Sequence, residues 1–264
     1  MEKEHRDFGK TYLIIGASSD VAVEYIRSLA KHTRKNAKNP ILICAHYYRN
    51  KDKLEEIARE YSGIELKLLQ ADLTEEEQAL KLVNQVMQYV KYPNYILHFP
   101  AMTFDYMRYR EIDTDYLRQE MNVQLYSFLI ITREFLPLMH KEYGNRVLVM
   151  LTSYLAEELP PKFMADYVVA KYALLGAMKA AAAEYGGKNL KINGISPIMM
   201  DTKFLSKMDS KIKELAAMKS SINRVPKPEE LIPYIDELLD SGCTKNGYNL
   251  VIDESYFEAK EPEE

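Results

Sequence analysis

The sequence is poor in cysteine, with two in 264 residues. Cys44 lies inside an apolar run and Cys243 follows Ser241 and Gly242, so the pair is far apart and lacks metal-ligand spacing. We therefore expect no metal site and no disulfide. We interpret Cys44 as a small buried residue of a strand, because free cysteine is among the most buried residue types.

Long apolar runs and clustered positive charge are also missing. No run approaches the roughly 18 apolar residues of a membrane span, and the N-terminus, MEKEHRDFGK, is charged where a signal peptide is apolar. The formal net charge is −4, and lysine and arginine are spread along the chain. These features exclude nucleic-acid and membrane partners, and they predict a cytoplasmic protein.

The sequence lacks an internal repeat and a Gly/Ser-rich linker. Its 47% hydrophobic and 28% charged residues are typical of a soluble globular protein. We therefore predict a single domain over residues 1–257, followed by a short acidic tail at residues 258–264 that is interrupted by Pro262.

Apolar runs of strand length alternate with longer helical patterns. The predicted strands are Thr11–Gly16, Ile41–Ala45, Glu65–Leu69, Tyr95–His98, Arg146–Leu151, Lys191–Ile195 and Tyr248–Ile252. The predicted helices are Val21–Lys31, Asp52–Tyr61, Glu75–Val90, Asp113–His140, Ala165–Tyr185, Ser210–Ala217 and Lys227–Leu239. Most strands are continuous apolar runs, which is typical of a parallel sheet buried on both faces. The pattern predicts an α/β fold: a doubly wound, Rossmann-type parallel sheet of about seven strands with helices on both faces.

Glycine is scarce in the loop after the first predicted strand. This loop reads Gly16-Ala17-Ser18-Ser19-Asp20-Val21-Ala22, and it precedes a helix whose N-terminal amides are placed to bind a pyrophosphate. A fully formed loop has three glycines, whereas Asp20 and Ala22 occupy two of the positions here. Two interpretations stay open. Either Gly16, Ser18, Ser19, Asp20 and Val21 bind a dinucleotide, with the Asp20 carboxylate turned away, or the polar residues only cap a helix.

The ends of the next two strands bear on cofactor type. No acid follows the second strand, where NAD-preferring folds often place one, and Arg49 is suited to a 2′-phosphate. The third strand is followed by Asp72 and Leu73, and the Asp72 carboxylate could accept a hydrogen bond from adenine. The alternatives are that Arg49 is a solvated turn residue and that Asp72 caps the next helix. We predict binding of NADP(H) in preference to NAD(H).

Tyr167 and Lys171 are four residues apart in a helical segment, so they share one face. A neighbouring ammonium and a positively charged nicotinamide both favour the phenolate, so we expect the pKa of Tyr167 to be lowered toward neutrality. The Y-x-x-x-K spacing is common by chance in a chain with 20 tyrosines. The hydroxyl of Ser153, at the end of the Arg146–Leu151 strand, supplies the independent support.

This ordered set resembles the short-chain dehydrogenase/reductase family from Thr11 to about Tyr256. The resemblance implies that Ser153 orients the substrate carbonyl and that Tyr167 donates or accepts the proton. It further implies that Lys171 holds the nicotinamide ribose and lowers the tyrosine pKa, while Asn122 helps to anchor a water in the proton relay.

Two later segments extend the resemblance. Residues 193–202 are similar to the family's post-strand segment, which implies that Pro197 and Thr202 lie at the nicotinamide carboxamide. Residues 246–253 are similar to the family's last strand, which in many members contributes to a tetramer contact. The sequence departs from the family pattern at two places. It has His98-Phe99-Pro100-Ala101 where the family has N-N-A-G, which puts Pro100 beside the adenosine ribose. It also has Ile198 where the family commonly has a glycine.

The resemblance implies reversible hydride transfer between NAD(P) and a small-molecule carbonyl or alcohol, in a homodimer or homotetramer. We expect Tyr154, Met164 and Met200 to line the substrate pocket and residues 204–223 to form its lid. Two alternatives remain. One is a non-catalytic dinucleotide-sensing or scaffold protein, suggested by the altered phosphate loop, and the other is a reductase of a sugar or polysaccharide pathway.

Overall fold

The structure, a computed structural model, describes residues 8–33, 39–103, 106–203 and 210–258. Within these residues one parallel sheet runs in the order β3-β2-β1-β4-β5-β6-β7. The strands are β1 (Lys10–Ile15), β2 (Ile41–Tyr47), β3 (Ile64–Gln70), β4 (Tyr95–His98), β5 (Asn145–Met150), β6 (Leu190–Pro197) and β7 (Asn249–Ile252). The predicted seven-stranded, doubly wound α/β fold is confirmed.

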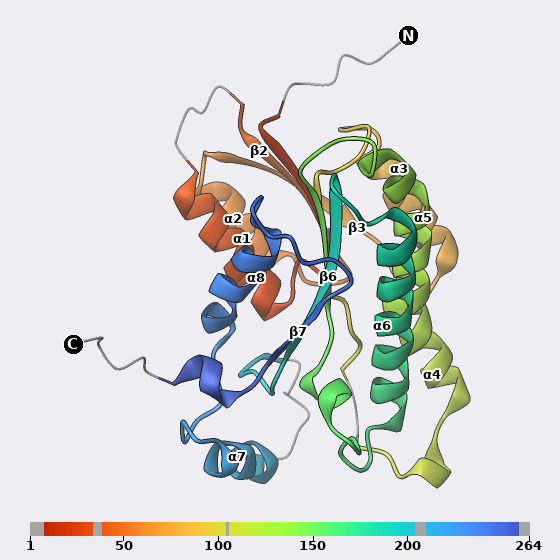
Figure 1. The fold of residues 1–264 in the computed structure, drawn as a ribbon, viewed down its shortest axis with the longest axis vertical. Helices are drawn as coiled ribbons and strands as arrows, with labels where there is room; N and C mark the ends of the chain where they lie inside the picture. Colours follow the sequence, from red (N-terminus) through yellow and green to blue (C-terminus); the bar gives the residue numbers. More distant parts are fainter. Residues whose placement is uncertain (1–7, 34–38, 104–105, 204–209, 259–264) are drawn as a thin grey trace, which may run out of the picture.

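Helices cover both faces of this sheet. They are α1 (Asp20–His32), α2 (Asp52–Glu60), α3 (Glu76–Val86), α4 (Thr114–Met121), α5 (Ser127–Met139), α6 (Ala165–Tyr185), α7 (Ser210–Lys219) and α8 (Ile232–Leu239). Helices α1, α2 and α8 lie against one face, and α3, α4, α5 and α6 lie on the other (Figure 1). The central strands are therefore apolar on both sides, which explains their continuous hydrophobic runs.

Two predicted helices are interrupted in the structure. The predicted helix Asp113–His140 consists of α4, a π-helical turn η2 (Asn122–Tyr126) and α5. The predicted helix Lys227–Leu239 begins with a 3-10 turn, η5 (Pro228–Leu231), before α8. The π turn inserts a residue without ending the hydrophobic periodicity, so the sequence pattern does not reveal it.

The topology of the sheet determines where the candidate site lies. The strand order reverses between β1 and β4, and Ile15 pairs with His98 at their carboxyl ends. In open α/β sheets this edge is where ligands bind. Residues 204–209 of the expected lid and residues 259–264 of the expected tail lie outside the described residues.

Two smaller expectations concern single segments. Cys44 is buried in β2, as predicted, and both cysteines are free thiols. Of the helices within the described residues, none combines the length and the apolar character that crossing a membrane requires.

Candidate active site

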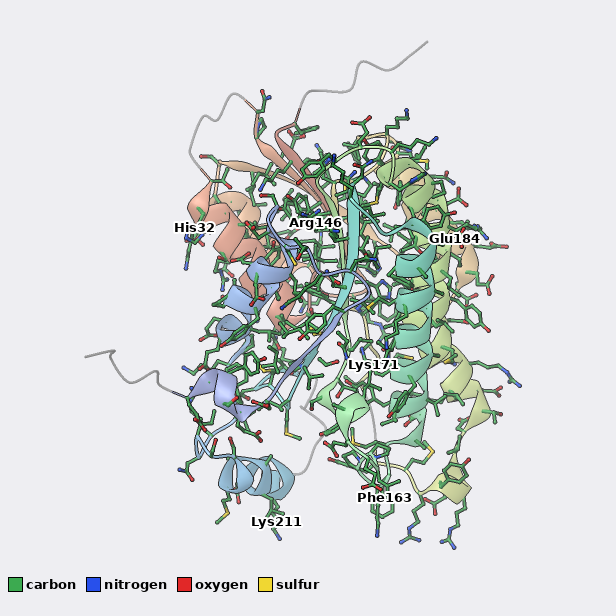
Figure 2. The ribbon with its side chains drawn as sticks, viewed as in Figure 1. His32, Arg146, Phe163, Lys171, Glu184 and Lys211 are labelled. Atoms are coloured by element: carbon green, nitrogen blue, oxygen red, sulfur yellow. The ribbon has the colours of Figure 1, made fainter. Side chains whose placement is uncertain are left out.

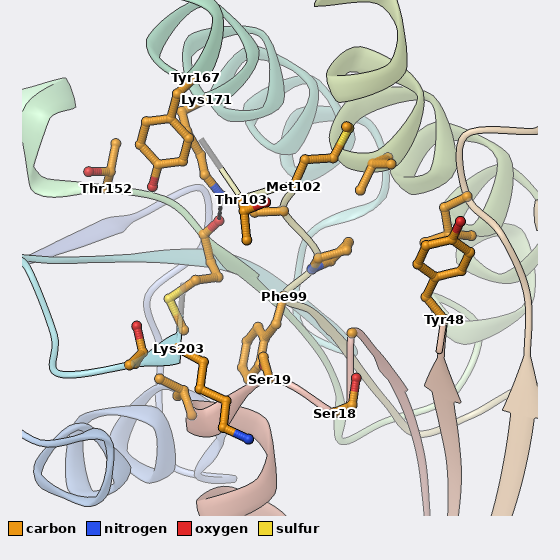
Figure 3. A pocket seen from close by; sticks show the side chains of 18 of the residues that line it. Ser18, Ser19, Tyr48, Phe99, Met102, Thr103, Thr152, Tyr167, Lys171 and Lys203 are labelled. Atoms are coloured by element: carbon orange, nitrogen blue, oxygen red, sulfur yellow. Dashed lines mark hydrogen bonds between the residues drawn. The ribbon is translucent and has the colours of Figure 1, made fainter. Parts of the chain in front are cut away.

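A cleft of about 1040 Å³ runs along the carboxyl edge of the sheet, lined by the segments that follow β1 to β6 (Figure 3). Every residue predicted to bind the cofactor lines it: Gly16, Ser18, Ser19, Asp20, Val21, Arg49, Asp72, Leu73, Pro100, Tyr167, Lys171, Pro197 and Thr202. Asn122 lines it as well, whereas Ser153 does not. The fold therefore collects residues from distant parts of the sequence at one site.

Gly16, the glycine of the first loop, has a backbone conformation that favours glycine. Its φ is +72°, and a Cβ added there would lie 2.9 Å from the backbone nitrogen of Pro100. Its amide donates to Nδ1 of His46 at 3.1 Å, and Nε2 of that histidine lies 3.1 Å from the carbonyl of Ala71. The ring therefore joins the ends of β1, β2 and β3. Burial lowers the pKa of His46 to about 4, so the imidazole is neutral, as the Gly16 bond requires.

Asp20 has turned away from the phosphate position, although it does not cap helix α1. Its carboxylate accepts the backbone amide of Lys203 at 2.6 Å and pairs with the ammonium of Lys53 at 2.9 Å. Burial alone would raise the pKa of Asp20, but these two partners hold it below its ordinary value. The carboxylate thus joins α1, α2 and the segment after β6 instead of opposing a bound anion.

The phosphate end fits a dinucleotide pyrophosphate. Helix α1 begins at Asp20 and presents its first-turn amides to the cleft, with Ser18 and Ser19 on the preceding loop. The Ser19 hydroxyl is buried and has no hydrogen-bond partner within the part of the chain that is described, and Ser19 makes no side-chain cap. A donor without a partner beside such a helix end suits a phosphate oxygen better than it suits a cap.

Tyr48, Arg49 and Asp72 form a small polar group at the adenosine end. Arg49 donates to the Tyr48 hydroxyl at 2.9 Å, and its guanidinium lies 4.5 Å from that ring's centroid. Asp72 accepts from the amide and hydroxyl of Thr74 at 3.0 and 2.7 Å. Burial would raise the pKa of Asp72, but the bonds from Thr74 and Tyr48 lower it. Asp72 therefore caps the turn after β3, and it still borders the cleft.

Thr152, Tyr167 and Lys171 meet at the other end of the cleft (Figure 3). Burial raises the pKa of Tyr167, and a hydrogen bond with the Thr152 hydroxyl opposes this only partly. The Lys171 nitrogen is 5.6 Å from the Tyr167 ring centroid. The expected lowering of the tyrosine pKa is thus absent from the protein groups alone, because desolvation of the phenolate dominates. Tyr167 is a protonated acid in this state.

Ser153, the hydroxyl predicted for this centre, begins a 3-10 turn, η3 (Ser153–Ala156), and lies off the cleft. Strand β5 ends at Met150, one residue before the predicted end, and the adjacent Thr152 takes the inward position. Thr152 and Ser153 are consecutive hydroxyl residues at a strand end, so the sequence alone did not indicate which of them lines the cleft. Which one faces inward depends on where the strand stops.

Lys171 is 2% exposed on the face of α6 turned toward the sheet, and it donates to the carbonyl of Met150 at 2.8 Å (Figure 2). Burial lowers its pKa to about 8, and the carboxyl of Glu120 opposes that shift. Glu120, on α4, is itself 2% exposed. Sequence reasoning missed it, because a glutamate in a polar helix carries no signal of burial.

The remaining predicted residues border the cleft with internal partners. Asn122, at the start of the π turn, donates to the carbonyl of Thr74 at 2.7 Å. The Thr202 hydroxyl donates to the carbonyl of Met200 at 3.4 Å. Asn122 therefore fastens the helical side of the cleft to the end of β3.

The rim beside Tyr167 is apolar. The cleft is lined there by Tyr154, Met164, Met199 and Met200, and all of these except Met199 were expected. Met164 packs with Tyr167 in a small buried cluster. Flexible methionine side chains tolerate varied apolar shapes. This end of the site suits a substrate with an apolar portion.

Comparisons with known proteins agree with this geometry. Residues 26–254 match a family model described as enoyl-(acyl carrier protein) reductase. A 3-oxoacyl-[acyl-carrier-protein] reductase of Thermotoga maritima is 25% identical over 231 residues, covering 86% of this chain and 89% of the relative. An uncharacterized oxidoreductase of Bacillus subtilis is 24% identical over 84% of this chain and 88% of its own.

Solved structures share the fold. A short-chain dehydrogenase/reductase of Serratia marcescens aligns with a TM-score of 0.79 at 20% identity, covering 96% of this chain and 99% of the other. A short chain dehydrogenase of Burkholderia cenocepacia in complex with NADP aligns with a TM-score of 0.77 at 16% identity, covering 96% and 100%.

Proposed function

Because the chain belongs to the short-chain dehydrogenase/reductase family, we propose that it interconverts a carbonyl and an alcohol, with NADP(H) as the hydride carrier. The observation that carries this proposal is the meeting of Thr152, Tyr167 and Lys171 at one end of the dinucleotide-sized cleft. When bound, the cofactor supplies or accepts the hydride at its nicotinamide ring. All other steps fall to the residues of this chain.

In the reductive direction, the hydroxyls of Thr152 and Tyr167 hold the substrate carbonyl oxygen. The Tyr167 O–H bond then breaks as the proton passes to the developing alkoxide, and a phenolate remains. The raised pKa of Tyr167 keeps the proton on the acid until that moment. The Lys171 ammonium, beside the ring, stabilises the phenolate by its charge.

The cofactor-binding roles divide along the cleft. Ser18, Ser19 and the first turn of α1 hold the pyrophosphate, and Arg49 pairs with the 2′-phosphate of NADP while it stacks on adenine. Pro197 and Thr202 border the nicotinamide end. The similar structure from Burkholderia cenocepacia is a complex with NADP, which supports the same cofactor here.

Tyr167→Phe tests the chemistry. We expect kcat to fall by about 100- to 10,000-fold, because the variant lacks the acid that we place at the carbonyl, while the Kd for NADPH stays the same. The matched control is Tyr143→Phe, the same change at a side chain that is 66% exposed and does not line the cleft. Near-normal turnover in Tyr167→Phe would refute the assignment, and loss of NADPH binding would indicate misfolding instead.

Arg49→Ala tests cofactor choice. The guanidinium is exposed and stacked on Tyr48, so its removal should weaken NADPH binding by about 10- to 100-fold through a lost charged hydrogen bond. Binding of NADH should weaken much less, because NADH has no 2′-phosphate and loses only the stacking of Arg49 on adenine. Calorimetry with both dinucleotides measures this, with Arg133→Ala, at an exposed position of α5, as control. Equal losses for both cofactors would contradict an NADP preference, and binding of neither by the wild type would leave a non-catalytic role.

The apolar rim guides the choice of substrates. The family model and the Thermotoga relative are both described as reductases of substrates on acyl carrier protein, so we propose a 3-oxoacyl thioester as the first carbonyl to test. Simple ketones and sugar-linked ketones complete the panel. Reduction of a simple ketone alone would argue against an acyl substrate.

We also propose that copies of the chain associate through α5 and α6. Leu129 on α5 and Val169 and Tyr172 on α6 are exposed by 42%, 48% and 45%. Apolar side chains exposed on neighbouring helices are typical of surfaces between copies. Light scattering that reports a monomer at micromolar concentration would overturn this proposal.

A further inference from the structure

A buried polar cluster lies behind Lys171, on the side away from the substrate rim. Its members are Glu120 and Gln124 from the α4–η2 region, His98 from β4 and Asp166 from α6, and all are at most 4% exposed. Such groups are costly to bury, and a carboxylate has the highest cost. The position of Glu120 therefore requires a physical reason.

Glu120 is held in a fixed position. One carboxylate oxygen accepts the side-chain amide of Gln124, and the other accepts the backbone amide of Met102 at 3.2 Å. Met102 lines the cleft in the segment after β4. The carboxylate is thus fastened between α4 and the loop that borders the site, within the electrostatic reach of Lys171.

The titratable side chains that act on Glu120 lie on α6. They are Lys171, Asp166 and the protonated Tyr167, while His98 on β4, in the same cluster, is neutral because burial lowers its pKa to about 3. Asp166 disfavours a charged Glu120, while Lys171 favours it. Burial raises the pKa of Glu120 to about 7, so above that pH Lys171 is the one cation in this described cluster and Glu120 is the anion that acts on it.

We propose that Glu120 is the counter-ion of Lys171, a positioning residue that keeps the lysine charged in the core without touching substrate. This inference rests on the proposed function, since it assigns the Lys171 ammonium a role beside Tyr167. The two groups act through the electrostatic field between them, because the Lys171 ammonium donates its hydrogen bond to the carbonyl of Met150. Burial opposes this charge, as the lowered pKa of Lys171 shows, and without Glu120 the loss of charge would go further.

Glu120→Gln is a sharp test, because it removes the charge and preserves the shape. Its amide oxygen can still accept from Met102. Gln124 can turn its own amide, whose oxygen has no partner within the described residues, to accept from the new amide nitrogen. Asp115→Asn is the matched control, the same chemical change on the same helix at a side chain that is 78% exposed.

The measurement is an NMR titration of the Lys171 Cε signal in the cofactor-free protein, assigned by its loss in Lys171→Arg. We expect the pKa of Lys171 to fall by about 1 to 3 in Glu120→Gln and to stay constant in Asp115→Asn. In carbonyl reduction, the alkaline limb of the kcat/KM profile should move to lower pH by the same amount. A purely structural role would lower rates without moving either titration.

An unchanged Lys171 titration in folded Glu120→Gln would overturn the proposal. If that variant does not fold, the wild type decides: the Glu120 carboxyl carbon and Lys171 Cε must respond to each other's titration. Independent midpoints near the ordinary values of about 4.3 and 10.4 would overturn it. The titration needs no substrate, so a shifted Lys171 in a protein that reduces no carbonyl refutes the proposed function and leaves the counter-ion in place.

Discussion

Gly16 has the most restricted backbone in the candidate site. Its left-handed φ and the closeness of Pro100 leave no room for a side chain. The other two glycine positions of a full phosphate loop have no such restriction here. Asp20 forms the first residue of α1, and Ala22 is buried without a left-handed backbone. The loop has thus kept a glycine only where the contact with the segment after β4 requires it.

Gly16→Ala should lower the free energy of unfolding by about 1–3 kcal/mol, since the new methyl strains the backbone and would collide with main-chain atoms. Gly176→Ala is the control. This glycine is exposed within α6, and a Cβ there meets nothing within 4 Å, so the change should stabilise by about 0.5–1 kcal/mol. Urea unfolding of both variants measures the difference. A Gly16→Ala protein as stable as the wild type would show that the loop adapts.

The sequence identified the residues of the candidate site better than it identified the side chains that contact them. Tyr167 and Lys171 were predicted from helical spacing, and the structure brings both into the cleft. Thr152 was passed over for its neighbour, because the choice depends on one residue of strand length. Glu120 was missed, since its burial comes from tertiary packing that local sequence does not encode.

At the scale of elements, prediction succeeded where a pattern is continuous. The apolar runs located every strand of the described sheet, and β4 and α6 have the predicted bounds. The π turn between α4 and α5 was hidden because the helical periodicity carries through it. That turn matters for the site, since it sets Asn122 against the end of β3.

Asp20 also acts at the element scale. It links the start of α1 to Lys53 on α2 and to the segment after β6 through Lys203. In the sequence alone, an acidic residue in a phosphate-binding loop argues against binding of a dinucleotide. In the fold, the carboxylate is neutralised by partners 33 and 183 residues away, which a linear motif does not show.

For the whole molecule, buried titratable groups set how stability depends on pH. Burial lowers the pKa of His46 to about 4 and of His98 to about 3, from 6.5. Their stabilisation is present above pH 6.5 and is lost as the pH falls, because the unfolded chain binds the protons. Burial raises the pKa of Glu120 from 4.5 to about 7, so its contribution has the opposite sign over the same interval.

Between about pH 5 and 6.5 two histidines therefore oppose one carboxyl, which leaves a net uptake of about one proton on unfolding. We expect acidification across this interval to lower the free energy of unfolding by about 2 kcal/mol. Glu120→Gln removes the opposing group and is expected to bring the pKa of Lys171 into this interval, so its loss should grow to at least about 3 kcal/mol, whereas Asp115→Asn should follow the wild type. Urea unfolding at the two pH values gives these differences. Stability that is equal or higher at pH 5 in the wild type would mean that the two histidines accept protons inside the fold.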